Sequence, residues 1–153
     1  MTIMFNTILH EAGLMVAYVR LLRHKDNQSK KGRSPYELWR DNRPQFELYQ
    51  STQLIKNRHK FNAPFWAVFV VNTENETTFA GLYSAKYHGI FEQDIPSSNL
   101  DDVEKAGSRD VFDLELLDVQ NDLIGKLVID WGPAYRSWVQ YPERNNKTII
   151  KLT

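Results

Sequence analysis

Short runs of β-branched and aromatic residues recur at close spacing along the chain, separated by turn-forming residues. The clearest is FWAVFVV at 65–71, a continuous apolar run typical of a strand buried in a sheet. The run at 78–91 is longer, and Gly81 within it predicts a bend. Further strand-like runs lie at 16–24, 111–117, 127–129, 137–141 and 148–152. Strands at this spacing favour an antiparallel sheet, and we expect about six of them.

Helices are predicted only in the first 64 residues. A short one is expected over 8–12, and a longer one should begin at Ser34-Pro35, where Glu37 completes a capping box. A third should begin near Pro44 and fade near Asn57. Their aromatic residues expected in the core are Trp39, Phe46 and Tyr49. The chain as a whole, residues 1–153, is predicted to be a single α+β domain. We expect a strongly bent antiparallel sheet or small β-barrel with two to three helices packed on it.

Charge is distributed unevenly although the formal net charge is zero. Residues 20–60 hold eleven Lys and Arg against four acidic residues, a balance of +7, whereas residues 61–153 have a balance of −6. This asymmetry predicts a basic face for a polyanion, and the alternative is two solvated faces that neutralise each other. The candidate nucleic-acid-binding residues are Arg20, Arg23, His24, Lys25, Lys30, Lys31, Arg33 and Arg40.

An aromatic turn, DWGPAYRSW at 130–138, is the second candidate binding feature. Trp131 and Trp138 bracket a Gly-Pro turn, Arg136 lies between them, and Asp130 offers a hydrogen-bond acceptor. An extruded base requires aromatic faces to stack on and polar groups that read its edge. The alternative is that both indoles are core side chains on either side of a tight turn.

No complete catalytic motif is present, so the chain is not expected to be an enzyme. It has no cysteine, and no phosphate-binding loop, serine-hydrolase elbow or zinc-helix motif occurs. We therefore predict no catalytic residue, metal ligand or cofactor. One pair keeps a metal-dependent nuclease open as an alternative. Asp113 and Glu115 should share the outward face of a strand whose Phe112, Leu114 and Leu116 point inward, although two solvated carboxylates fit that pattern equally.

The chain resembles, from Phe5 to Leu152, a domain that precedes the nuclease domain in bacterial proteins of the GIY-YIG nuclease family. The likeness is carried by RLLRHKD at 20–26, GRSPYELWR at 32–40, FELYQSTQ at 46–53, FAGLY at 79–83, LVIDWG at 127–132 and RSW at 136–138. The paired GIY and YIG tripeptides of the nuclease domain are missing. The resemblance thus implies an accessory recognition domain, used in restriction or phage defence, whose nuclease is a partner or a missing C-terminal domain.

By architecture alone, the strand-rich half also resembles small barrels of the PUA/EVE type, some of which capture modified bases in aromatic pockets. On this analogy, which is a fold-level one, the base pocket is lined by Tyr83, Trp131 and Trp138. Asp130 and Arg136 would then read the polar edges of the base.

The predicted function is therefore a DNA-binding module, and the aromatic turn favours a modified or flipped base as its ligand. A protein-interaction domain that docks a nuclease partner is the main alternative, and the metal-dependent nuclease is the weaker one. No apolar run approaches the ~20 residues that span a bilayer, and the N-terminus lacks a signal-peptide pattern. We accordingly expect a cytoplasmic protein with no membrane partner.

Overall fold

The computed structural model describes residues 3–24, 34–54, 62–91, 109–133 and 138–152. Its helices are α1 (Phe5–Glu11), α2 (Pro35–Asp41) and α3 (Arg43–Ser51), with short 3₁₀ turns at Val16–Tyr18 and Asn121–Leu123. Its strands are β1 (Val19–His24), β2 (Thr52–Leu54), β3 (Phe65–Val71), β4 (Thr77–Phe91), β5 (Arg109–Leu116), β6 (Val128–Ile129), β7 (Val139–Gln140) and β8 (Ile149–Lys151). The predicted α+β class is confirmed.

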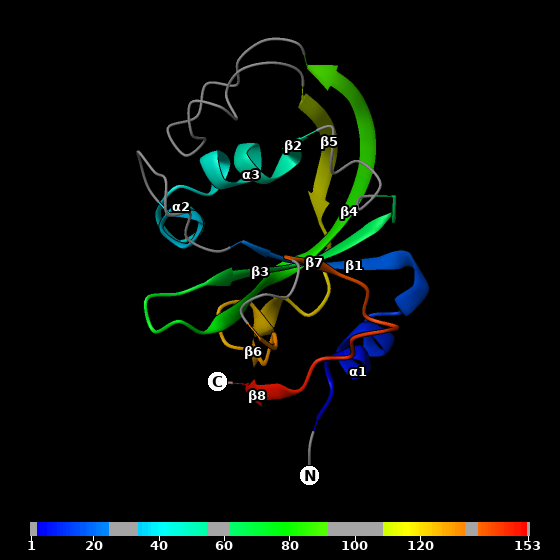
Figure 1. Cartoon of the computed structure of the whole chain (residues 1–153), viewed down its shortest axis with the longest axis vertical. Helices are drawn as coiled ribbons and strands as arrows, with labels where there is room; N and C mark the ends of the chain where they lie inside the picture. The colour runs from blue at the N-terminus through cyan, green and yellow to red at the C-terminus, as the bar shows by residue number, and fades with distance from the viewer. Residues whose placement is uncertain (1–2, 25–33, 55–61, 92–108, 134–137, 153) are drawn as a thin grey trace.

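The strands form one sheet in the order β2-β5-β4-β3-β1-β7. Strand β6 pairs with the first two residues of β4, Thr77 and Thr78, and β8 pairs with β6. The described strands do not close into a barrel, because β2 and β7 end the path at opposite sides. Helices α2 and α3 cover one face of the sheet, and α1 lies on the other (Figure 1).

The expectation of a purely antiparallel sheet was wrong at one pair, because β1 and β3 are parallel from Val19↔Phe65 to His24↔Val70. Between these two strands the chain passes through α2 and α3, and such a crossover returns it to the end where β1 began. The continuous apolar run of β3 is itself typical of a strand that is buried on both faces. The apolar run at 65–71 was therefore a sequence feature that favoured the parallel pairing of β3 with β1.

The two faces of β3 belong to two separate cores. Ala67 and Phe69 pack toward α1, whereas Trp66, Val68 and Val70 pack toward α2 and α3. Successive side chains of a strand point to opposite faces, so a fully apolar strand supplies both cores at once. We call these the α1 face and the helix-pair face of the sheet.

Strand β4 bends as the sequence predicted. Its register against β3 shifts between Val68 and Phe69, opposite Gly81 and Phe79. Gly81 has a φ of +138°, a conformation that other residues rarely adopt. A second register shift lies between Tyr87 and Gly89, against β5. These shifts accompany the strong curvature of β4 (Figure 1).

The predicted start of α2 is confirmed in detail. Ser34 accepts the backbone N–H of Glu37 at 3.2 Å, Glu37 accepts the backbone N–H of Ser34, and Pro35 is the first helical residue. Trp39 and Phe46 are buried as expected. The next helix ends at Ser51 and gives way to β2, so the expected extension toward Asn57 was wrong over 52–54. No helix among the described residues is long and apolar enough to cross a membrane.

Candidate functional site

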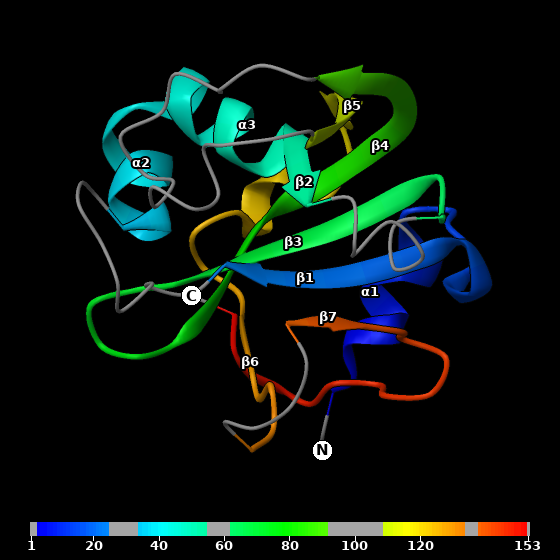
Figure 2. The same ribbon diagram turned by 45° about the horizontal axis from the view of Figure 1, so that its top comes forward.

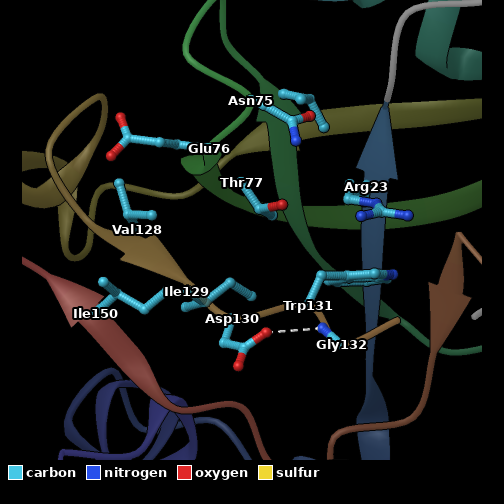
Figure 3. Close-up of a pocket in the computed structure, with 11 residues that line it drawn as sticks. Arg23, Asn75, Glu76, Thr77, Val128, Ile129, Asp130, Trp131, Gly132 and Ile150 are labelled. Carbon is cyan, nitrogen blue, oxygen red and sulfur yellow. Dashed lines mark hydrogen bonds between the residues drawn. The ribbon is translucent and has the colours of Figure 1, made fainter. Parts of the chain in front are cut away.

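A pocket of about 370 Å³ opens on the α1 face beside β6 (Figure 3). Arg23 at the end of β1, Asn75 and Glu76 from the β3–β4 turn, and residues 128–132 line it. Its apolar walls come from Val71, Val128, Ile129 and Ile150. Pockets of 300–1,000 Å³ suit small molecules or single groups of a larger ligand, so this one has room for a compact ring.

Trp131 forms the buried floor beneath Arg23. The guanidinium carbon of Arg23 lies 5.1 Å from the centre of the indole, and Lys147 Nζ lies 4.9 Å from the same ring. Lys147 also donates a 2.8 Å hydrogen bond to the Trp131 carbonyl. The indole is only 3% exposed. The surface offered to a ligand is therefore the guanidinium plane of Arg23, which the indole supports by a cation–π contact.

Arg23 retains unused hydrogen-bonding capacity. No carboxylate among the described residues forms an ion pair with it, and its buried Nε has no hydrogen-bond partner there. Burial lowers the pKa of the guanidinium, because the charged form is partly desolvated. A desolvated cation without a counter-ion is stabilised by any acceptor that enters the pocket.

Asp130 supplies an exposed acceptor on the same pocket. One oxygen, Oδ1, accepts the backbone N–H of Gly132 at 3.0 Å (Figure 3). This bond fixes the carboxylate across the turn, and Oδ2 has no partner among the described residues. Glu76, in contrast, is already occupied: Asn72 Nδ2 donates to it at 3.1 Å and Lys151 Nζ at 3.2 Å. These two donors, Asn72 first, lower the pKa of Glu76.

The predicted basic residues that the structure describes do not form one surface. Lys25, Lys30, Lys31 and Arg33 lie outside the described residues. Arg20 and Arg23 are three positions apart on β1, so their side chains leave opposite faces of the sheet. Arg40 is exposed, and its Nε and Nη2 donate to the carboxylate of Asp41 at 2.8 and 2.7 Å.

His24 is a core residue of the helix-pair face. It is 4% exposed, and its ring packs edge-on against Phe46 and Tyr49. Its Nε2 lies 3.3 Å from Gln50 Oε1. Burial lowers the pKa of His24 to about 4, only partly opposed by the bond to Gln50, so the ring is neutral near pH 7.

The sheet divides the predicted base pocket into two halves. Asp130 and Trp131 line the pocket on the α1 face. Tyr83 and Trp138 belong to the helix-pair face, where the Tyr83 hydroxyl donates to Glu47 Oε1 at 2.9 Å. Arg136 lies outside the described residues. The five residues therefore do not converge on one ligand, although two of them share a site with Arg23.

Several pocket residues were missing from the sequence prediction. Arg23 was assigned to the predicted basic face and not to the base pocket, and Asn75, Glu76 and Ile150 were not singled out. The alternation of β1 carried a usable signal, since it separates Arg23 from Arg20. Asn75, Glu76 and Ile150 come from segments that the pairing of β6 with β4 and β8 brings together. Local sequence patterns do not predict this pairing.

The carboxylate pair on β5 is exposed as predicted. Asp113 and Glu115 face solvent, and Phe112 is buried on the opposite side. Leu116, expected inside, is 40% exposed, because it lies at the end of the strand. Asp113 Oδ2 is 3.1 Å from His88 Nδ1. In the part of the chain that the structure describes, no group of three or more His, Asp or Glu side chains could hold a metal ion.

No family model, curated protein or solved structure matches this chain. The resemblance to the domain that precedes GIY-YIG nuclease domains therefore stays a prediction. The geometry of this chain's own residues is the basis for its function.

Proposed function

We propose that this chain is a DNA-binding module that holds one flipped or unpaired base, including a modified one, in the pocket beside β6. The observation that carries this proposal is the guanidinium of Arg23, which lies on the buried indole of Trp131 without a carboxylate partner among the described residues. Unstacked bases commonly stack on arginine planes as well as on aromatic rings. Arg23 thus takes the stacking role that the sequence assigned to the tryptophan.

Asp130 supports the proposal because it adds an exposed acceptor to the lining of the same pocket. Exocyclic amino groups of bases donate to carboxylates, and ring nitrogens and carbonyls accept from arginine. A pocket that holds both signs of hydrogen-bonding group, with apolar walls from Val128 and Ile150, suits a flat polar ring. The volume of about 370 Å³ accommodates one such ring with its substituents.

A protein-docking function receives less support. An exposed aromatic surface around Trp66 and Trp131 would favour it, and these side chains are 0% and 3% exposed. A large apolar patch of the kind that marks protein interfaces is not formed by these two residues. A nuclease partner remains part of the proposal in another way, since a base-reading module would deliver such an enzyme to its DNA.

Fluorescence polarisation with labelled DNA tests this function. The probes are duplexes with cytosine, 5-methylcytosine or 5-hydroxymethylcytosine at one position, and the corresponding single strands. Asp130→Asn should weaken binding of the preferred probe by about 1–2 kcal/mol, roughly tenfold, because a base contact is lost. Glu115→Gln, which removes an equally exposed carboxylate on β5, is the matched control and should change nothing.

The proposal is wrong if no probe binds at low ionic strength. It is equally wrong if Asp130→Asn and Glu115→Gln have the same effect, because the pocket would then take no part in binding.

A further inference from the structure

A second arginine–aromatic cluster lies at the β7 side of the sheet. Arg20 of β1 and Tyr141, the residue after β7, are cross-strand neighbours, because Leu21 pairs with Gln140 in antiparallel register. The guanidinium carbon of Arg20 lies 4.1 Å from the centre of the Tyr141 ring. Figure 2 shows β7 running beside β1 at this side of the sheet.

Arg144 joins the same ring through a tight turn. Its backbone N–H donates to the Tyr141 carbonyl at 3.0 Å, which folds the chain back on itself. The guanidinium carbon of Arg144 then lies 5.3 Å from the centre of the Tyr141 ring. Arg144 is exposed, whereas Arg20 is half-buried. Two cations from distant parts of the sequence are thus held on one phenol.

No carboxylate neutralises these two cations within the described segments. Arg20 donates from Nη2 to Asn62 Oδ1 at 2.8 Å and from Nη1 to the Val19 carbonyl at 3.2 Å, and both acceptors are uncharged. The buried Nε of Arg20 has no partner there. The two ring distances add up to less than the Debye length of about 10 Å at 0.1 M salt. The like charges therefore repel each other across Tyr141.

Arg40 is an ion-paired arginine in the same molecule, to be compared with Arg20 and Arg144. Its guanidinium is paired in bidentate fashion with Asp41, and it needs no further anion. Arg20 and Arg144 both lie on Tyr141, and neither has an acidic partner in the part of the chain that the structure describes. An anion that bridges them would remove the repulsion and fill the free donors of both guanidinium groups.

We propose that Arg20 and Arg144, held on Tyr141, bind a phosphate of the nucleic-acid backbone. This inference rests on the proposed function, because it supplies the backbone contact for the base that the β6 pocket holds. Arginine forks match phosphate oxygens in bidentate geometry, which favours phosphate as the anion. The cluster also lies close to the pocket along the chain, since Arg20 and Arg23 are about 10 Å apart on β1.

The edge of the sheet brings the two sites within reach of one strand of nucleic acid. Strand β7 is two residues long and ends the sheet on this side. Beyond β1 the sheet continues on this side only in β7 among the described strands, so the helix-pair face and the α1 face meet at this edge. A strand of nucleic acid passing over β7 places a phosphate on Arg20 and Arg144 and turns a base toward Arg23.

The salt dependence of DNA binding tests the inference. The logarithm of the association constant falls with the logarithm of salt concentration by ~0.9 per duplex phosphate contact, or ~0.7 for single strands. Arg144→Gln should therefore make this slope shallower by about that amount and weaken binding several-fold at 0.1 M salt. Arg144→Lys should keep the slope, because the charge remains. Lys126→Gln, which removes an exposed cation that belongs to neither site, is the matched control and should leave slope and affinity unchanged.

The outcomes separate this inference from the proposed function. If the protein binds DNA and Asp130→Asn weakens binding, but Arg144→Gln leaves the slope unchanged, the phosphate site is wrong and the base pocket stands. If Arg144→Gln changes the slope and Asp130→Asn has no effect, the phosphate site stands and the base pocket is wrong. Equal binding of polyglutamate and of an oligonucleotide of the same charge would contradict a phosphate site, and absence of binding contradicts both.

Discussion

The two faces of the sheet treat their polar side chains in opposite ways. On the helix-pair face, Tyr83 and Gln50 both donate to Glu47, and Gln50 in turn meets His24. These groups satisfy one another inside the protein. On the α1 face, Arg23 and Asp130 line a pocket, and Nε of Arg23 and Oδ2 of Asp130 have no partner among the described residues. Buried polar groups that bond to one another stabilise the fold. Polar groups at a pocket without a protein partner can instead form hydrogen bonds to a ligand.

The comparison therefore predicts that substitutions on the helix-pair face change stability and those at the rim of the α1 face change binding. Four expectations test this contrast, in order of decreasing effect on stability.

Phe69→Ala should produce the largest loss in the free energy of unfolding. Such a loss would show that the α1 face has a packed core and that only its rim is available to a ligand. Phe69 is fully buried, with ring centres 5.2 Å from Phe5 and 5.7 Å from Phe79. Removing a buried phenyl ring costs about 3–5 kcal/mol. Urea denaturation followed by tryptophan fluorescence measures it. A loss below about 1 kcal/mol would mean that this face has no rigid core.

His24 should lower the free energy of unfolding by roughly 3 kcal/mol as the pH falls from 7 to 4. Its folded pKa of about 4 lies below the ordinary value of 6.5, so the unfolded chain binds more protons between these values. The stabilisation is complete above pH 6.5 and is lost as the pH falls toward 4. Urea midpoints measured from pH 7 to pH 4 should show this fall.

His24→Gln should flatten that profile, because glutamine does not titrate. Glu47 acts in the opposite direction: burial raises its pKa above 4.5, so its contribution falls as the pH rises through the folded value. Measuring Glu47→Gln in parallel separates the two. Identical profiles for the wild type and His24→Gln would show that His24 is not held neutral.

Tyr83→Phe should cost about 1–2 kcal/mol, because Glu47 loses a hydrogen-bond donor in a half-buried site. The Tyr83 hydroxyl donates at 2.9 Å, and phenylalanine keeps the ring that packs in the core. Chemical denaturation gives the loss, and DNA affinity should stay unchanged. A change in affinity without a change in stability would reverse the roles of the two faces.

Asp130→Asn should change stability by no more than about 0.5 kcal/mol, because the side chain is exposed and amide oxygen can still accept the Gly132 N–H. This is the smallest of the four effects on folding, and it accompanies the loss of binding expected above. Thermal melts of the two proteins side by side provide the measurement. A large drop in melting temperature would mean that the carboxylate serves the fold.

Local patterns predicted the local features well. The Ser34–Glu37 capping box fixed the start of α2, and Gly81 marked the bend in β4. The runs at 127–129, 137–141 and 148–152 each contain a short strand. These features depend on neighbours in sequence, which is why they could be read from it.

The site depended on contacts that local patterns do not contain. Arg23 meets Trp131 only because β1, β4 and β6 belong to one sheet, and Arg20 meets Tyr141 only because β7 pairs with β1. The division of the aromatic residues between two faces also followed from the pairing of the strands. Alternation along β1, in contrast, is a local pattern and could have separated Arg20 from Arg23. Proximity in sequence was the wrong guide for grouping the residues of 130–138.

The shortness of β6 has a consequence for how the pocket moves. Strand β6 contributes two residues, Val128 and Ile129, to its pairing with β4 and β8, and one further backbone bond on either side, at Leu127 and at Asp130, extends that pairing. Strand β3, in contrast, is held along its length by two neighbours. Backbone held by so few bonds opens locally at a smaller free energy than a central strand does. The amide protons of the wall that carries Asp130 should therefore exchange sooner than those of β3, and a ligand that ties this wall to Arg23 would slow that exchange.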